Sequence, residues 1–409
     1  MENKTSVTLQ NFPKYNFTGR RTQKSKKIKI GYVSNDFNIK HPICHLIKDL
    51  FVSHNKKIFE VYGYVHNKDF TKIDKKILNG FDYLVDITKV NNQKAAELIY
   101  KDGIDILIDL KGYTHESRLE IFAFRPAPIQ VTYLGFPGTT GSDFIDYVVA
   151  DKTVAPTQIA QYFTEKVIYL PKCYQINSKK VVSKKKIKRS DFHLPEDKDV
   201  FASFNSSHKI TGEAFMLWMK ILKKADSSVL WLLMNDDKTK NNFKKQAGIN
   251  GVNPKRIIFT HYLPNKEHLA RIKLADIVLD TLTYNGHTTT SDCIWSKVPV
   301  VTKLGGHFAS RVSASILSTV GLKSLVAKNN NEYVRIASEL ALNPKKLKAV
   351  KKHLEDSKNT LPLFDIKTYV RELESSYMTI QKLYKDGAQP QSIKYHDKSK
   401  NFVISSGIG

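Results

Sequence analysis

The sequence predicts an α/β protein with two doubly wound domains. In the first half, short β-branched or aromatic segments alternate with segments of helical spacing, which is typical of a parallel sheet covered by helices on both faces. A charged stretch near residues 178–195 interrupts the alternation, and the same pattern then starts again. The length of 409 residues suits two or three domains.

Five segments of the first half are expected to be strands because they are short and rich in β-branched or aromatic residues. Helical spacing predicts helices over residues 43–54 and 92–103, between the strands. The expected strands are KIKIGYV (27–33), FEVYGYV (59–65), DYLVDIT (82–88), IDILIDL (104–110) and IQVTYLG (129–135).

The second half repeats the alternation. A helix is expected where Phe215, Trp218, Ile221 and Leu222 share one face. The expected strands are VFASFNSS (200–207), SVLWLLM (228–234), RIIFTHYL (256–263), DIVLDT (276–281) and PVVT (299–302). We expect a basic N-terminal tail (1–26), a first Rossmann-like domain (27–178), a charged linker (179–195), a second Rossmann-like domain with a closing C-terminal helix (196–387) and a flexible tail (388–409). Two such domains would face a central cleft, where ligands of these folds bind.

The composition limits the classes of protein to consider. Three widely spaced cysteines argue against a disulfide framework or a CxxC zinc site and suit a cytoplasmic protein. A signal peptide is not expected in the polar N-terminus, nor a membrane span anywhere. The net charge of +26 would suit a nucleic-acid partner, but the lysines are spread along the chain. We therefore interpret most of them as solvated and do not expect a nucleic-acid partner.

The segment YNGHTTTSDCIW (284–295) follows one expected strand and opens a helix. A helix N-terminus has free N–H groups and a positive dipole end, so it can bind phosphate. Thr288 and Thr289 can instead cap the helix, and Thr289 with Asp292 resembles a capping box. Capping leaves Asn285, Gly286 and His287 unexplained, because a glycine lets backbone approach a ligand and a histidine adds a donor.

Further loops at strand ends have related chemistry. Lys209 follows the strand in SFNSSHKI, and TKLGGHFASRVSAS leads two glycines into a helix that carries Arg311. LGFPGTTG (134–141) is either a plain tight turn or a loop that presents backbone N–H groups to an anion or a sugar. His41 lies at a strand end, where it is either a general base or positioning residue, or a capping or exposed histidine. No third ligand accompanies His41 and His45, and no Asp-x-Asp pair is convincing, so no metal is expected.

Several stretches together resemble the catalytic region of the O-GlcNAc transferases and their bacterial relatives, glycosyltransferase family 41. They occur in the family's order over residues 27–385: GYVSNDF…HP, DLKGYT, RPAPIQVTYLGFPGTTG, DYVVAD, FNSSHKI, LPNKEHLAR, LADIVLDTLTYNGHTTTSD, W…VPVVT, FASRVSASIL and LPLFDIKTYVRELESSY. The resemblance implies a GT-B architecture and inverting, metal-independent transfer of a sugar from UDP to a protein hydroxyl, with no cofactor.

The resemblance also implies residue roles. The residue at position 41 matches the family's histidine at the sugar–acceptor junction, and Lys209 matches the lysine on the diphosphate. The remaining positions are implied to bind the donor: His268 and Arg271 at the uridine, His287, Thr288 and Thr289 at the diphosphate, Asp292 at the ribose, Gly135, Pro137, Gly138 and Thr139 at the sugar, and Ser206, Tyr284, Asn285 and Gly286 around them.

Departures from the family bear on the sugar and the acceptor. Ser206 stands where animal members have a glutamine, Asn265 where they have a lysine, and Tyr284 where they have a cysteine near the N-acetyl group. Plant fucosyltransferases of the family also have a tyrosine there but lack the NGH that follows here. The animal enzymes' acceptor-choosing tetratricopeptide repeats are not found in this sequence. We expect transfer of GlcNAc to Ser/Thr of an unidentified protein; UDP-glucose, an Asn acceptor and a non-catalytic nucleotide-sugar-binding protein stay open.

Overall fold

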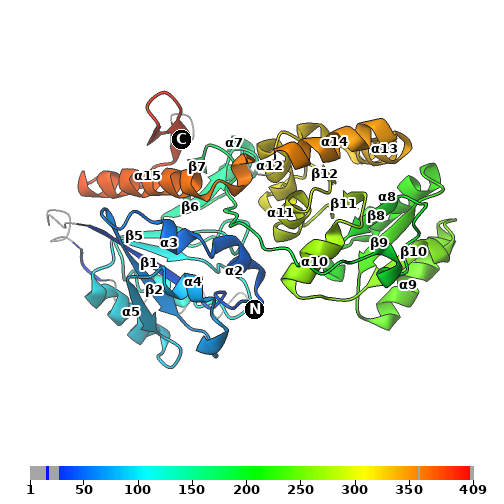
Figure 1. Cartoon of the computed structure of the whole chain (residues 1–409). Helices are drawn as coiled ribbons and strands as arrows, with labels where there is room; N and C mark the ends of the chain where they lie inside the picture. Colours follow the sequence, from blue (N-terminus) through cyan, green and yellow to red (C-terminus); the bar gives the residue numbers. More distant parts are fainter. Residues whose placement is uncertain (1–14, 18–26, 358–359, 406–409) are drawn as a thin grey trace. The chain divides into compact units, whose positions relative to one another are not determined.

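The protein is described by a computed structural model over residues 15–17, 27–357 and 360–405. It consists of two compact units, which we describe one at a time (Figure 1). Unit 1 comprises the chain up to Ser178 and from Asp365 onward, and unit 2 comprises Lys179–Phe364. Most of the predicted N-terminal tail lies outside the described residues. Among the described helices, none is both long enough and apolar enough to cross a membrane.

Unit 1 is built on a nine-stranded sheet with the order β15-β14-β7-β6-β5-β4-β1-β2-β3. All neighbouring strands are parallel except β14 and β15. The strands are β1 (Ile28–Ser34), β2 (Phe59–Val65), β3 (Tyr83–Asp86), β4 (Ile106–Asp109), β5 (Ile129–Thr132), β6 (Tyr147–Asp151), β7 (Lys166–Leu170), β14 (Ile393–His396) and β15 (Asn401–Ile404).

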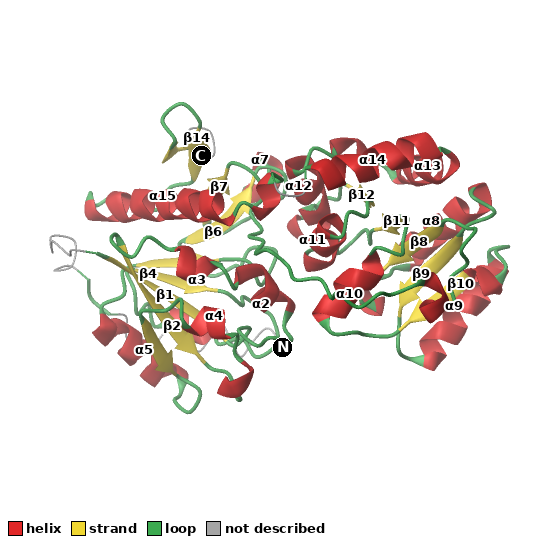
Figure 2. Cartoon of the chain, in the orientation of Figure 1, coloured by secondary structure: helices red, strands yellow, loops and turns green. Residues whose placement is uncertain are grey.

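Helices cover the unit 1 sheet, and the longest is α15 (Figure 2). They are α2 (Pro42–Ile47), α3 (Leu50–Ser53), α4 (Lys75–Leu78), α5 (Asn92–Asp102), α6 (Glu120–Ala123), α7 (Thr157–Ala160) and α15 (Ile366–Lys385). The helix expected over 43–54 is divided into α2 and α3. Ser178 explains the division, because its Oγ accepts a hydrogen bond from Asp49 N at 2.9 Å and its N donates to Leu46 O at 2.9 Å.

The C-terminal segment corrects the predicted domain boundary. Helix α15 belongs to unit 1 rather than to the second domain. A buried network fixes it there: Glu374 lies 2.9 Å from Nδ1 of His54, whose Nε2 lies 2.9 Å from the Tyr32 hydroxyl. The expected tail from residue 388 forms β14 and β15 instead, and Ser392 Oγ accepts from Val167 N. These strands extend the sheet from the edge of β7.

Unit 2 has a six-stranded parallel sheet with the order β10-β9-β8-β11-β12-β13. The strands are β8 (Val200–Ser203), β9 (Val229–Leu233), β10 (Ile257–Thr260), β11 (Ile277–Leu279), β12 (Val300–Lys303) and β13 (Val326–Ala327). The helices are α8 (Gly212–Lys224), α9 (Asp237–Ile249), α10 (Asn265–Ile272), α11 (Thr288–Trp295), α12 (Val312–Thr319), α13 (Asn330–Leu342) and α14 (Pro344–Asp356). Buried Trp218 and Trp231 anchor its core.

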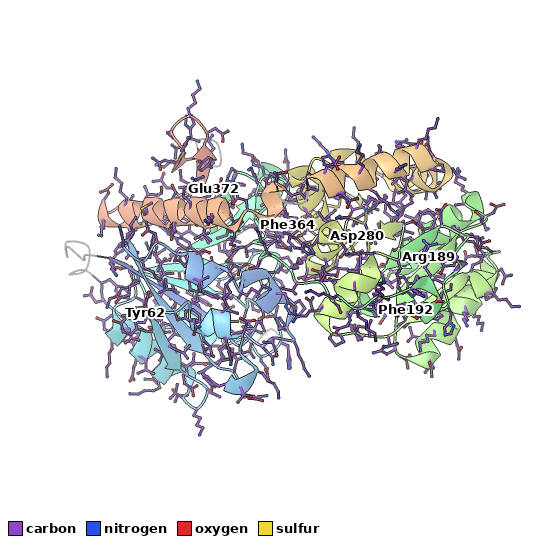
Figure 3. The ribbon with its side chains drawn as sticks, viewed as in Figure 1. Tyr62, Arg189, Phe192, Asp280, Phe364 and Glu372 are labelled. Carbon is purple, nitrogen blue, oxygen red and sulfur yellow. The ribbon has the colours of Figure 1, made fainter. Side chains whose placement is uncertain are left out.

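The predicted linker packs on unit 2 and is not a solvated spacer. Its short 3-10 helix η3 (Arg189–Phe192) places Phe192 against Trp231, with ring centroids 5.3 Å apart (Figure 3). Arg189 donates to the Asp276 carboxylate at 2.7 Å and to the carbonyls of the following turn. Four lysines of the charge run are exposed, as the sequence predicted: Lys184, Lys185, Lys186 and Lys188. The contacts of Arg189 were not predicted, because its partners lie far away in the sequence.

Candidate functional site

The unit 2 sheet has a topological switch point between β8 and β11. From β8 the chain adds strands in one direction through β9 and β10, and from β11 it adds them in the other through β12 and β13. Ligands of open α/β sheets bind at such a point, outside the carboxyl ends of the strands. The loops after β8 and β11 contain the predicted residues 206, 209 and 284–287, and Thr288 and Thr289 open the helix α11 that follows. The structure thus brings these groups together.

Lys209 ends the short 3-10 helix η4 (Ser207–Lys209), which directly follows Ser206 after β8. Its Nζ donates to Asn285 O at 3.1 Å and lies 3.9 Å from the centroid of the Tyr284 ring. Burial lowers the pKa of Lys209 to about 8, although Asp280 raises it. Within the residues that the structure describes, Lys209 forms no ion pair with a carboxylate. Its ammonium contacts a carbonyl and an aromatic ring instead.

Asp280 organises the loop after β11, and the sequence interpretation missed it (Figure 3). The side chain is 1% exposed, and its Oδ1 accepts from Gly286 N at 2.7 Å and Thr281 N at 2.9 Å. Its Oδ2 accepts from the Thr302 hydroxyl at 2.7 Å. Burial raises the pKa of Asp280, while these donors lower it. An acid directly after an apolar strand segment was the available signal.

Gly286 is required by close packing in this loop. A Cβ at this position would lie 2.7 Å from the Thr290 hydroxyl and 3.2 Å from the Asn205 side-chain oxygen. The neighbouring Asn285 is fully buried, and its Nδ2 donates to Thr281 O at 2.7 Å. The NGH sequence therefore forms a rigid loop whose backbone passes close to the strand ends.

The N-terminus of α11 does not support the alternative in which its threonines cap the helix. The N-cap residue is His287 rather than Thr288 or Thr289, and no side chain caps the helix. The expected box between Thr289 and Asp292 does not form. Within the described residues, no side chain caps the first-turn amides of α11, and uncapped N–H groups at a helix N-terminus are a feature of anion sites in general.

His287 is neutral at pH 7. Burial, and secondarily the Lys209 charge, lower its pKa to about 3. Its ring stacks on Tyr284, with centroids 4.9 Å apart, and its Nε2 lies 3.3 Å from Ala309 O. Because a carbonyl oxygen only accepts, Nε2 carries the single proton of the neutral ring and donates it to Ala309 O, and Nδ1 is left as an acceptor.

Helix α10 brings His268 and Arg271 to the Phe204 ring, beside β8. Arg271 Nε donates to His268 Nδ1 at 3.0 Å, and the guanidinium carbon lies 5.6 Å from the Phe204 centroid. His268 meets the same ring edge-on at 5.3 Å. Burial lowers the pKa of Arg271 to about 10 and, with the Arg271 charge, that of His268 to about 4.

Asp292 has a partner that was not predicted. Its carboxylate lies 2.7 Å from Nζ of Lys180, a residue of the predicted linker, and both side chains are almost fully buried. The two residues are far apart in the sequence, so no local pattern signals the pair. Any ligand hydroxyl at Asp292 would meet a carboxylate that already has a cation.

The unit 1 sheet has its own switch point between β1 and β4. His41, after β1, is the N-cap of α2, where its Nδ1 accepts from Ile43 N at 3.3 Å. Its Nε2 lies 3.5 Å from Asp36 Oδ1. The same oxygen forms an ion pair with Nζ of Lys111 at 2.6 Å. Burial lowers the pKa of His41, and Asp36 partly offsets this. The buried Asp36–Lys111 pair was not anticipated from the sequence.

The LGFPGTTG loop follows β5 and is closed on itself. A Cβ on Gly135 would lie 2.2 Å from Leu110 O, so only glycine fits there. Glu165, another residue missed in the sequence, accepts from Thr139 Oγ1 and from Thr140 N, each at 2.6 Å. Pro137 is buried, and Gly138 N donates to Phe136 O at 3.1 Å.

The hydrogen bonds of this loop favour the tight turn at four of its positions. The amides of residues 135, 138, 140 and 141 already donate within the loop or to Glu165. These four amides are therefore engaged inside the protein, and the predicted role of the loop at the sugar stays a prediction. Within the described ranges, we also find no group of three or more His, Cys, Asp or Glu side chains arranged to hold a metal.

Comparison with known proteins identifies the family. The model of glycosyl transferase family 41 matches residues 3–188 and 178–373. The probable UDP-N-acetylglucosamine–peptide N-acetylglucosaminyltransferase SEC of Arabidopsis thaliana is 41% identical over 385 residues, which cover 92% of this chain and 39% of that protein. The chain thus spans about two fifths of this relative's length.

Solved structures agree with this match. A mutant of the Thermobaculum terrenum O-GlcNAc transferase superposes with a TM-score of 0.80 at 29% identity, covering 88% of this chain and 69% of that one. Anabaena HepE, in complex with UDP and glucose, has a TM-score of 0.56 at 12% identity over 86% of this chain and 100% of its own, a likeness of fold alone. The two Rossmann-like units have the GT-B fold, and the chain belongs to glycosyltransferase family 41.

Proposed function

We propose that this chain transfers N-acetylglucosamine from UDP-GlcNAc to serine or threonine hydroxyls of proteins, with inversion and without a metal ion. The names of the relatives support the donor and the protein acceptor. The chemistry of the unit 2 switch point supports the handling of UDP. The uridine, diphosphate and sugar roles of the individual residues are part of the proposal.

The observation that supports the proposal most is that Lys209 forms no ion pair with a carboxylate of the described residues. Lys209 lies beside the loop that leads into the uncapped N-terminus of α11, and Asp280 is saturated by other donors. A departing diphosphate gains negative charge in the transition state, and fixed positive groups stabilise that charge best in a dry site. Two positive groups from the protein can take the role that a metal has elsewhere.

Arg271 and Arg311 have different roles from Lys209. Arg271 is fully buried and donates to Thr260 Oγ1 at 3.0 Å, so it builds the loop after β10. Arg311 donates to Gly305 O at 2.7 Å and holds the loop after β12. The planar guanidinium of Arg271 and the neutral imidazole of His268 suit a flat, uncharged ring, and we assign the uracil to them.

The proposed reaction is a single displacement. The acceptor oxygen attacks the anomeric carbon, the bond from that carbon to the β-phosphate oxygen breaks, and its electron pair leaves on UDP. The acceptor proton passes to a base, and attack opposite the leaving group inverts the anomeric configuration. His41 is our candidate base, because it follows β1 at the unit 1 switch point and burial lowers its pKa. To accept the proton, its Nδ1 must first release the hydrogen bond from Ile43 N.

The test uses the whole chain with UDP-GlcNAc or UDP-glucose and co-expressed proteins. Mass spectrometry of the acceptors should find a HexNAc on Ser or Thr with the parent protein and none with Lys209→Ala. A hexose or a modified Asn would select the alternatives. UDP binding without any transfer would identify a non-catalytic nucleotide-sugar-binding protein, and the absence of UDP binding would refute the proposal.

A further inference from the structure

One aromatic ring in unit 2 contacts two of the groups assigned to the diphosphate. The Tyr284 centroid lies 3.9 Å from Nζ of Lys209 and 4.9 Å from the centroid of the His287 ring, whose plane is tilted by 23°. A cation over the face of a tyrosine is attracted by the negative face of the π-system, and more so away from water. Lys209 is half-buried here, so water screens this attraction less than at an exposed site.

The backbone of the same residue is fixed. Tyr284 O accepts from the Thr281 hydroxyl at 2.6 Å, and the next residue binds through Asn285 N to Ala309 O at 3.0 Å. Lys209 Nζ donates to Asn285 O at 3.1 Å. Two consecutive residues of one rigid loop therefore define the ammonium position, one through its ring and one through its carbonyl.

We propose that Tyr284 is a positioning residue, whose ring holds the ammonium of Lys209 where the donor diphosphate binds. This inference rests on the proposed function. A lysine side chain is flexible, and holding it in one place before the ligand arrives lowers the entropy lost on binding. Tyr284 acts through Lys209 in this role.

This role differs in its consequences from that of a sugar gate. A gate would touch the sugar, so changing it would alter the preference between UDP-GlcNAc and UDP-glucose and leave the binding of UDP alone unaffected. A positioning residue for Lys209 affects the diphosphate, which all three ligands share. Its loss should weaken all of them by the same factor, UDP included.

The first experiment measures UDP binding by calorimetry to the full chain and to Tyr284→Leu and Tyr284→Phe. We expect Leu to weaken UDP about tenfold and Phe to stay within about threefold of the parent. Within the described ranges the Tyr284 hydroxyl makes no hydrogen bond, so the ring alone carries the effect. Tyr162→Leu, at a tyrosine that is 77% exposed, is the matched control and should bind UDP as the parent does.

The second experiment is a double-variant cycle with Lys209→Met. If Tyr284 acts through Lys209, adding Tyr284→Leu to Lys209→Met causes no further loss of UDP affinity. Losses that multiply would overturn the inference. Thermal unfolding confirms that each variant is folded, and Tyr284→Met replaces Tyr284→Leu if the latter does not fold.

The outcomes separate the inference from the function on which it rests. If the parent binds UDP and Tyr284→Leu binds it equally well, the inference alone fails. A change in the ratio of UDP-GlcNAc to UDP-glucose turnover with unchanged UDP affinity would show a sugar gate and overturn the positioning role. If the parent binds no UDP, the proposed function fails and the inference fails with it.

Discussion

The two switch points differ in whether their buried lysine is paired with a carboxylate. In unit 1, Lys111 and Asp36 are both buried and lie 2.6 Å apart, so the site neutralises its own cation. In unit 2, Lys209 meets a carbonyl and an aromatic ring, and the acid nearby, Asp280, accepts from backbone amides and a hydroxyl. Equivalent places on two similar sheets thus contain one satisfied charge and one available charge. The difference is consistent with our proposal that unit 2 binds the anionic diphosphate, while in unit 1 burial lowers the pKa of His41.

The largest effect expected from this comparison concerns stability in unit 1. Lys111→Met leaves Asp36 buried without its cation and should lower the free energy of unfolding by about 3–5 kcal/mol. Denaturant unfolding measures it. The double variant Lys111→Met with Asp36→Asn should regain much of the lost stability, because no buried charge is left unpaired. If Lys111→Met alone is as stable as the parent, the Asp36–Lys111 ion pair does not stabilise unit 1.

The mirror experiment in unit 2 concerns activity. Lys209→Ala should lower kcat/KM at least a hundredfold, about 3 kcal/mol of transition-state stabilisation, because a preorganised positive group at the leaving diphosphate is lost. The Tm should fall much less than in Lys111→Met, since Lys209 loses a carbonyl and a ring as partners and no buried carboxylate is left without its cation. A lower Tm with normal kinetics in the folded fraction would show that Lys209 is structural like Lys111.

Asp280→Asn tests the buried carboxylate that accepts hydrogen bonds from the loop after β11 and forms no ion pair with Lys209. In asparagine, one carboxylate oxygen is replaced by an NH₂ group, which cannot accept a hydrogen bond. Depending on its orientation, either the amides of Gly286 and Thr281 or the hydroxyl of Thr302 lose their acceptor. We expect a loss of about 1–3 kcal/mol in unfolding free energy and weaker UDP binding. Asp237→Asn, on the exposed start of α9, is the matched control. Unchanged stability and UDP affinity would refute the organising role of Asp280.

The pH dependence of UDP binding tests the charge of Lys209 directly. Its pKa is about 8 in the free protein, and bound diphosphate favours the protonated form. Affinity should therefore be constant from about pH 7 to 8 and fall by up to tenfold per pH unit above that. The decline should disappear in Lys209→Ala. A flat profile in the parent up to pH 10 would show that the ammonium does not bind the ligand.

The smallest effect is expected from chelation. If Lys209 and the α11 N-terminus stabilise the diphosphate without a metal, EDTA should change neither UDP affinity nor turnover. The matched comparison uses protein dialysed with EDTA and then supplied with Mg²⁺ or Mn²⁺. A large loss on chelation that either ion restores would contradict the metal-free proposal.

The alternation of strand and helix was predictable because each segment carries its own period. The fold class and the loop at residues 284–289 follow from local sequence. Three buried partnerships do not follow from it, because the two members lie far apart along the chain: Lys180 pairs with Asp292, Lys111 with Asp36, and Glu165 with Thr140. The α11 cap failed for a different reason, since a capping pattern is local but the helix begins one residue earlier than the threonines suggest.

The return of the chain to unit 1 has a consequence for synthesis. A ribosome releases residues in order, so all of unit 2 (179–364) emerges before α15, β14 and β15 exist. Until then the nascent unit 1 exposes the edge of β7, and His54 lacks the Glu374 carboxylate. The later unit can therefore finish folding first, in reverse of the usual N-terminal-first order. During that interval the unpaired β7 edge is a place where chaperones or a neighbouring nascent chain can bind.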